Sequence, residues 1–186
     1  MIEVGAATSA ALVELMVHAR RLLERLGGFA APPAARVALA LPFLRSGLTR
    51  WDPFPTLSIG TRFLFESQFK LHLAGKLVDL PAPLALAYMT AIAEIVLPVL
   101  LVVGLGTRFA ALGLLLMTGV IQLIVPDGWA NFHLYWAALA LSLLALGGGP
   151  LSADALIARL RARASRRGGC GANDRESRQP DGETRV

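Results

Sequence analysis

Long runs of apolar residues dominate the pattern of this chain. Residues 84–104 contain one charged side chain, that of Glu94, and residues 109–125 contain none. A helix needs roughly 20 residues, with about 17 as the lower end, to cross the hydrocarbon core of a bilayer. These two runs therefore predict two membrane-spanning helices.

Two further runs are shorter or less uniformly apolar. Residues 132–146 are apolar apart from two polar residues, and they need flanking small residues to reach both interfaces. Residues 29–48 hold Arg36, Arg45 and three prolines. Two of the prolines fall in the first turn, where proline is tolerated, and each arginine lies near one end, from which it can snorkel. We expect both runs to span, which predicts an all-α bundle of four transmembrane helices.

The first 28 residues predict a helix of another kind. Leucine and alanine recur at helical spacing on one face, whereas charged residues such as Arg21 and Arg25 occupy another. This pattern is typical of an amphipathic helix lying along a membrane surface. We expect it to end at Gly27 and Gly28. Packing on a soluble partner or on the bundle is the alternative.

The loop and the tail differ from the spans in composition. Residues 51–83 form a long, proline-punctuated loop in which residues 57–77 favour a short interfacial helix or re-entrant piece. After about Arg163 the chain is rich in Gly, Arg, Ser and Asp, which predicts a disordered basic tail. The expected organisation is an interfacial helix over 1–28, a membrane domain over 29–158 and the tail over 159–186.

Composition and charge agree with a membrane protein. The chain is 55% hydrophobic and 17% charged, whereas soluble domains average about 45–50% and about 25%. Twelve arginines lie on the side that holds both termini, against four basic residues in the loops on the other side. The positive-inside rule then places both termini in the cytoplasm, with residues 51–83 outside the inner membrane. Because the basic run in the tail follows a span so closely, it indicates an anchor to anionic lipid, and no nucleic-acid partner is expected.

Glu94 is the first candidate functional residue. It lies near the midplane of its predicted span, where an ionised carboxylate is costly without a partner. Small residues share its face and let another helix approach closely. Its carboxylate either handles protons or a ligand, or forms a structural ion pair. Arg36 and Arg45 are the expected partners.

His133, with Trp136 three residues later, is the second candidate. One other histidine, His72, lies outside the N-terminal helix, and two histidines without a third ligand make a weak case for a metal, so no metal site is expected. The single cysteine cannot form an intramolecular disulfide. Thr118 and Gln122 are interpreted as hydrogen-bonding between helices. No nucleophile-elbow, zinc-protease or phosphate-loop motif occurs, so the sequence identifies no enzyme class.

Several short motifs together resemble the DoxX family of small integral membrane proteins. Besides Arg36, Glu94 and His133, the matching motif residues at the ends of the spans are Gly47, Arg50, Gly104, Thr107, Arg108, Gly149, Ser152 and Asp154. The resemblance covers about residues 34–158. The long first loop and the basic tail depart from the family pattern.

The resemblance implies a four-helix membrane bundle and a link to membrane redox systems, among them a quinone-linked thiosulfate oxidoreductase. The departure in the first loop argues against transferring thiosulfate chemistry. We expect a subunit of a membrane-associated redox system, without a resident cofactor but with quinone as a possible ligand. A non-catalytic anchor or assembly partner for a soluble or exported protein is the alternative, and a small transporter ranks third. Expected partners are the lipid bilayer and other subunits or a second copy.

Overall fold

The structure is a computed structural model that describes residues 2–176, with side chains described for residue 12 and residues 14–165. Its elements in chain order are the helices and strands α1 (Ile2–Thr49), α2 (Ile59–Phe63), the π-helix η1 (Leu64–Gln68), β1 (Lys70–Leu73), β2 (Lys76–Asp79), α3 (Pro83–Val103), α4 (Thr107–Ile124), the 3-10 helix η2 (Pro126–Gly128), the π-helix η3 (Trp129–His133), α5 (Leu134–Leu146) and α6 (Ala153–Glu176). Four stretches are long and apolar enough to cross a membrane: Glu14–Thr49, α3, α4 and Pro126–Leu146. The predicted all-α fold with four membrane-spanning helices is confirmed.

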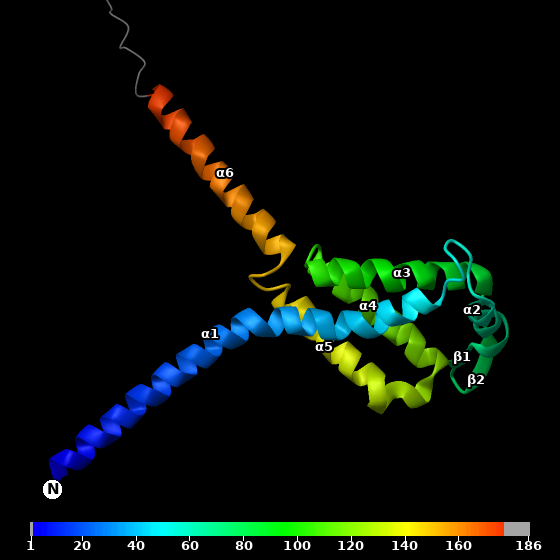
Figure 1. The fold of residues 1–186 in the computed structure, drawn as a ribbon, viewed down its shortest axis with the longest axis horizontal. Helices are drawn as coiled ribbons and strands as arrows, with labels where there is room; N and C mark the ends of the chain where they lie inside the picture. Colours follow the sequence, from blue (N-terminus) through cyan, green and yellow to red (C-terminus); the bar gives the residue numbers. More distant parts are fainter. Residues whose placement is uncertain (1, 177–186) are drawn as a thin grey trace, which may run out of the picture.

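The four membrane-spanning helices α1, α3, α4 and α5 pack into one bundle (Figure 1). α1 packs against α3 and α5, and α4 packs against the same two helices. Leucines from all four helices fill the middle, where Leu39, Leu101, Leu114 and Leu143 are almost fully buried. Buried alanines (Ala40, Ala110, Ala111 and Ala140) pack in the same cluster. Small residues of this kind let helix backbones approach closely, which is how membrane helices associate without a hydrophobic driving force.

The N-terminal helix does not end at Gly27 and Gly28, so that expectation is wrong. α1 runs without interruption from Ile2 to Thr49. Neither glycine has the positive φ that ends a helix, and each costs only about 1 kcal/mol relative to alanine inside one. Figure 1 shows α1 changing direction between its exposed N-terminal part and its packed part. A bend is expected near such glycines and the following Pro32 and Pro33.

The tail after Arg163 is not disordered as far as the structure describes it. α6 begins in residues 153–163, which are rich in alanine, leucine and arginine, among the best helix formers. It continues to Glu176 although residues 164–176 include three glycines. A low apolar content means that the segment cannot form a hydrophobic core, but it does not prevent the segment from being helical. Residues 177–186 of the expected tail lie outside the described residues. α6 and the N-terminal part of α1 leave the same end of the bundle and diverge (Figure 1). We call this the terminal end.

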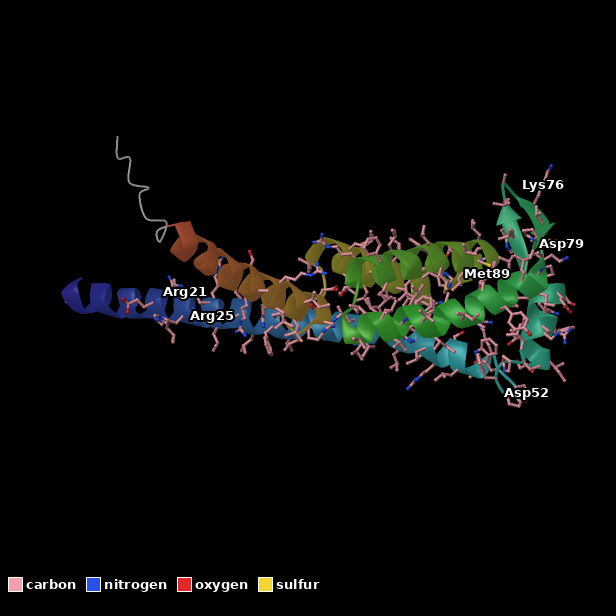
Figure 2. All side chains as sticks on the ribbon, turned by 90° about the horizontal axis from the view of Figure 1, so that it is seen from above. Arg21, Arg25, Asp52, Lys76, Asp79 and Met89 are labelled. Atoms are coloured by element: carbon pink, nitrogen blue, oxygen red, sulfur yellow. The ribbon has the colours of Figure 1, made fainter. Side chains whose placement is uncertain are left out.

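The long loop between α1 and α3 folds into a cap at the opposite end. The expected short helix is present as α2 and continues into η1. The antiparallel hairpin β1–β2 that follows was not expected. Its two turn residues, Ala74 and Gly75, both have positive φ, as a tight hairpin turn requires, but Ala-Gly is a weak sequence signal for one. Figure 2 shows Asp52, Lys76 and Asp79 together at this cap end, far from Arg21 and Arg25.

The cap covers a part of α3 that α1 does not reach. Gly47, near the end of α1, packs against Glu94 in the middle of α3. Beyond this level, Leu57 and Phe65 of the cap form a second buried cluster with Ala87 and Ala91 of α3. α1 therefore ends level with the middle of α3, and the cap occupies the remaining half of that side.

Candidate functional site

Glu94 forms an ion pair with Arg50, the residue directly after α1. Arg50 Nε donates to Glu94 Oε2 at 2.5 Å, and Arg50 Nη2 donates to Glu94 Oε1 at 2.7 Å. Glu94 is 1% exposed, and the Arg50 side chain is 14% exposed. This two-bond arrangement is the strong form of a charge-assisted hydrogen bond. A buried carboxylate thus obtains its counter-charge inside the bundle.

The expected partners of Glu94 were therefore wrong. Arg45 is exposed on the side of α1, and Arg36 lies near the terminal end. Arg50 was counted with the loop because it follows the last apolar turn of α1. The signal that points to it is its place among the resembling motif residues, one helical turn after Ser46 and next to the close-packing Gly47.

Ser46 and Phe65 contact the Arg50 guanidinium besides Glu94, and Gly47 sets the distance between the two helices. A Cβ added at Gly47 would lie 2.9 Å from the Cβ of Glu94, so only glycine lets the two backbones come this close. Ser46 Oγ accepts a long hydrogen bond of 3.4 Å from Arg50 Nη2. The ring of Phe65 lies 5.4 Å from the guanidinium carbon, within cation–π range.

The ion pair forms one wall of a cavity of about 250 Å³ inside the bundle. Four lining residues are polar: Ser46, Arg50, Thr90 and Glu94. The other lining residues are all apolar or aromatic and come from the cap, α3, α4, the segment after α4, and α5: Phe65, Phe69, Leu80, Leu86, Met117, Val120, Ile121, Ile124, Val125 and Trp136. A mostly apolar cavity with a few convergent polar groups is the usual form of a small-molecule site.

Arg36 has a structural role at the terminal end. Its Nη1 and Nη2 donate to the carbonyls of Val102 and Leu151, each at 3.2 Å. The residue is 3% exposed, and its Nε has no partner among the described residues. A cation is favourable beside the last carbonyls of a helix. Arg36 therefore joins the end of α3 to the segment that leads into α6.

Asp154 ties α6 to the start of α4. Its carboxylate accepts from the backbone N–H of Gly106 at 2.8 Å, and from the N–H and hydroxyl of Thr107 at 2.9 and 3.0 Å. Burial raises the pKa of Asp154, but these hydrogen bonds and the charge of Arg36 outweigh it, so the pKa is lowered overall. Ser152 caps α6 by accepting from the N–H of Ala155 at 3.1 Å.

The glycine-rich motifs serve this same junction. Gly104, Gly106 and Gly149 have positive φ. A Cβ on Gly148 would collide with the Thr107 hydroxyl, and one on Gly149 would collide with Pro32. Arg108 contributes a long, exposed hydrogen bond of 3.5 Å to the carbonyl of Ala145. Of the motif residues at the ends of the spans, Arg50 therefore lines the cavity and Gly47 packs against Glu94. The others hold the terminal end together.

His133 lies near the cap end but does not touch Glu94. Its Nδ1 donates to Gln122 Oε1 at 2.6 Å, and Gln122 Nε2 donates to the carbonyl of Pro126 at 3.0 Å. His133 is 4% exposed. The expected polar contact from α4 is thus made by Gln122, whereas the Thr118 hydroxyl bonds to the carbonyl of Leu114 in its own helix.

The imidazole of His133 does not line the cavity, but its centroid lies 5.5 Å from the ring of Trp136, which does. His72 donates to the carbonyl of Leu123 at 3.1 Å and so fixes the hairpin to the end of α4. Within the described residues, no three His, Cys, Asp or Glu side chains are grouped so as to hold a metal ion.

Comparison with known proteins identifies the family. A model of the DoxX family matches residues 31–127, which is more than half of the chain. No curated protein and no solved structure matches the chain. The matched range includes both members of the Arg50–Glu94 pair and most of the cavity wall. The chain is therefore a multi-pass membrane protein that belongs to the DoxX family.

Proposed function

We propose that this protein is a subunit of a membrane-associated redox system and binds the head group of a quinone beside Arg50 and Glu94. The cavity between the helices carries the proposal, because its only charged groups are this pair and its remaining wall is almost entirely apolar. Its volume of about 250 Å³ is just below the roughly 300–1,000 Å³ of typical ligand pockets. It therefore suits one ring system, with an apolar tail extending between helices.

The polar groups offer the hydrogen bonds that a quinone and its reduced form need. Arg50 uses Nε and Nη2 for Glu94, and no acceptor within the described residues bonds its Nη1. This donor is available to a quinone carbonyl. The Glu94 carboxylate accepts from a quinol hydroxyl and can take its proton, while the hydroxyl of Thr90, one turn earlier on α3, faces the same cavity. The redox partner that exchanges electrons with the quinone is a separate subunit in this proposal.

The proposal places the protein in the inner membrane with both termini in the cytoplasm. The charge count supports this orientation, since the termini and the loop between α3 and α4 carry most of the basic residues. Arg21 and Arg25 lie at the terminal end, and the cap lies at the other (Figure 2). The cap would then face the outside of the cell membrane.

Tryptophan fluorescence tests the proposal directly, because Trp136 lines the cavity. The chain has three tryptophans, and in a Trp51→Phe, Trp129→Phe protein only Trp136 remains. A short-tailed quinone should quench it in a saturable way, and Glu94→Gln or Arg50→Lys should weaken binding. Arg45→Gln is the matched control, since Arg45 is an exposed arginine on the same helix. Quenching that does not saturate, or that is equal in all variants, would contradict the proposal.

One observation favours the alternative of an anchor or assembly partner. The N-terminal part of α1 carries large apolar side chains that no other described part of the chain covers: Leu15, Leu22, Leu23, Leu26 and Phe29 are all more than half exposed. Deleting residues 1–26 tests it. The anchor role predicts that a co-purifying subunit is lost while quinone quenching of Trp136 remains; retention of every subunit would count against that role.

A further inference from the structure

A second chamber lies on the other side of Arg50. It has a volume of about 430 Å³, and four of its eight lining residues bear hydroxyl groups: Ser46, Thr49, Ser58 and Thr61. Arg50, Ser46 and Phe69 line both this chamber and the apolar cavity. The ion pair therefore stands at the boundary between an apolar space and a polar one.

The polar chamber reaches the middle depth of the bundle. Glu94 is the twelfth of the 21 residues of α3, so it lies about 16 Å from the cap end of that helix at about 1.5 Å per residue. Arg50 lies at the same level because α1 ends there. The chamber between Arg50 and α2 belongs to the cap, which covers the half of α3 beyond this level.

The backbone around this chamber is not regular. Between α1 and α2 only a few internal hydrogen bonds form, such as those from Asp52 N to Thr56 O and from Ser58 N to Arg50 O, each at 2.9 Å. Non-helical backbone at membrane depth is tolerated where it is buried in protein or lines a water-filled cavity. Together with four hydroxyl-bearing side chains, this backbone supplies the polar partners that water in a cavity requires.

The path toward the terminal end is closed. Leu39, Leu101, Leu114 and Leu143, each at most 1% exposed, fill the bundle on that side of the pair. Water in a space lined by such side chains has no hydrogen-bond partners. Only the cap side therefore offers the ion pair polar surroundings.

We propose that the polar chamber is a water-filled entry through which the Arg50–Glu94 pair exchanges water and protons with the cap face alone. The entry itself follows from the two chambers and the closed core. Its consequence rests on the proposed function: a proton that a bound quinol passes to Glu94 leaves on the cap face. Redox turnover at this site then releases protons on one face of the membrane only, whichever subunit takes the electrons.

Cysteine accessibility tests the entry. In a Cys170→Ser background no native thiol remains, and Ser46→Cys places a nearly isosteric thiol between the two chambers. Lys76→Cys on the exposed hairpin marks the cap face, and Thr118→Cys, at a core position 1% exposed, is the buried control. Each variant is treated in sealed vesicles of both orientations with a charged, membrane-impermeant methanethiosulfonate.

Ser46→Cys should react from the same side as Lys76→Cys, and about ten-fold or more faster than Thr118→Cys, because thiol reactivity follows access. Reaction from the opposite side, or a rate as low as that of Thr118→Cys, would overturn the entry. Ser58→Cys, on the cap side of the chamber, is a second probe and should react in the same orientation even if Ser46→Cys disturbs the pair.

A short-tailed quinone added before the reagent separates the two proposals. Slower labelling of Ser46→Cys, with unchanged labelling of Lys76→Cys, supports both the entry and the quinone site. Labelling that quinone does not slow supports the entry and counts against quinone binding. Absent labelling in a protein whose Trp136 is still quenched saturably counts against the entry and leaves the quinone site standing.

Discussion

Asp154, in the first turn of α6, accepts hydrogen bonds from both the backbone N–H and the hydroxyl of Thr107, the first residue of α4. The carboxylate thus acts as the N-cap of a helix 47 residues earlier in the chain. It satisfies backbone donors that a helix start leaves free, and its negative charge is favourable there. The backbone N–H of Asp154 also donates to the carbonyl of Gly104, at the end of α3, at 3.0 Å. A residue outside the four spans therefore fixes both the end of α3 and the start of α4.

Replacing this carboxylate should destabilise the bundle. Asp154→Asn removes the charge and leaves one oxygen to accept from three donors, so we expect a loss of about 1–2 kcal/mol, as for other N-cap losses. Thermal unfolding in detergent measures the effect. Asp127→Asn is the control, because Asp127 is exposed and has no hydrogen bond from its side chain within the described residues. An equal effect of the two substitutions would contradict the capping role.

The same junction should respond to acid. The pKa of Asp154 is lowered in the folded protein, whereas an unfolded aspartate has a pKa of about 3.9. The unfolded state therefore binds the proton more readily, so the contribution of Asp154 is complete above about pH 5 and is lost as the pH falls through the folded-state pKa. Melting temperatures between pH 6 and pH 3 should fall less steeply in Asp154→Asn than in the parent. Parallel curves would show that Asp154 contributes nothing to the acid response.

Gly47 should tolerate no side chain. Its Cβ would meet backbone and side-chain atoms of Glu94 and Ile95 at 2.9 Å, so Gly47→Ala must separate α1 from α3 and lengthen the Arg50–Glu94 bonds. Overpacking of this kind costs about 1–3 kcal/mol. Gly119→Ala is the matched control on α4, where a Cβ meets nothing within 4 Å, and it should stabilise by about 0.5–1 kcal/mol. A neutral Gly47→Ala would mean that the two helices are not held at this distance.

The spans could be predicted from the sequence because membrane insertion depends on length and apolar content, which single residues report directly. The partner of Glu94 could not. Pairing across helices depends on where α1 ends relative to α3, and that level is set by Gly47 and by the cap, whose hairpin has only a weak turn signal. Arg36 and Arg45 lie within the apolar run, whereas Arg50 lies after it. A search for the partner of Glu94 within the first span therefore favoured the wrong arginines.

The ends of α1 and α6 show a second limit. Gly27 and Gly28 are ordinary signals for a helix end, because glycine readily adopts the positive φ with which many helices end. Neither glycine adopts it here. The basic residues of α6 lack a core to bury, yet arginine and alanine are strong helix formers. The pattern of apolar residues therefore predicts which part of a helix is buried. It is a poor predictor of the residue at which an exposed helix ends.

The proposed orientation rests on the charge distribution, and reporter fusions check it. A reporter that is active only outside the cytoplasm should be silent after Val186 and active when inserted in the hairpin between Ala74 and Gly75, where the chain is exposed. The excess of arginine beside the termini is the physical reason. Activity after Val186, with silence in the hairpin, would reverse the orientation and move the proposed proton exit to the cytoplasm.

The Arg50–Glu94 pair allows stability and ligand binding to be separated. Either Glu94→Gln or Arg50→Gln breaks a buried pair, and the partner that remains is left without its counter-charge, so each should cost about 3–5 kcal/mol. Arg45→Gln should cost little, because Arg45 is exposed and has no ion pair within the described residues.

The double variant Arg50→Met, Glu94→Leu removes both charges and keeps similar volumes. An apolar replacement of a buried pair is often neutral or stabilising, so this protein should recover most of the stability lost in the single variants, and a double-mutant cycle should show strong coupling. If the pair also binds a quinone head group, the recovered protein will no longer quench saturably at Trp136, since the cavity has lost both its charged donor and its carboxylate. A double variant that is stable and still binds quinone with the parent's affinity would make the pair purely structural. Single variants as stable as the parent would instead show that neither charge depends on the other for stability. The two short hydrogen bonds between Arg50 and Glu94 argue against that result.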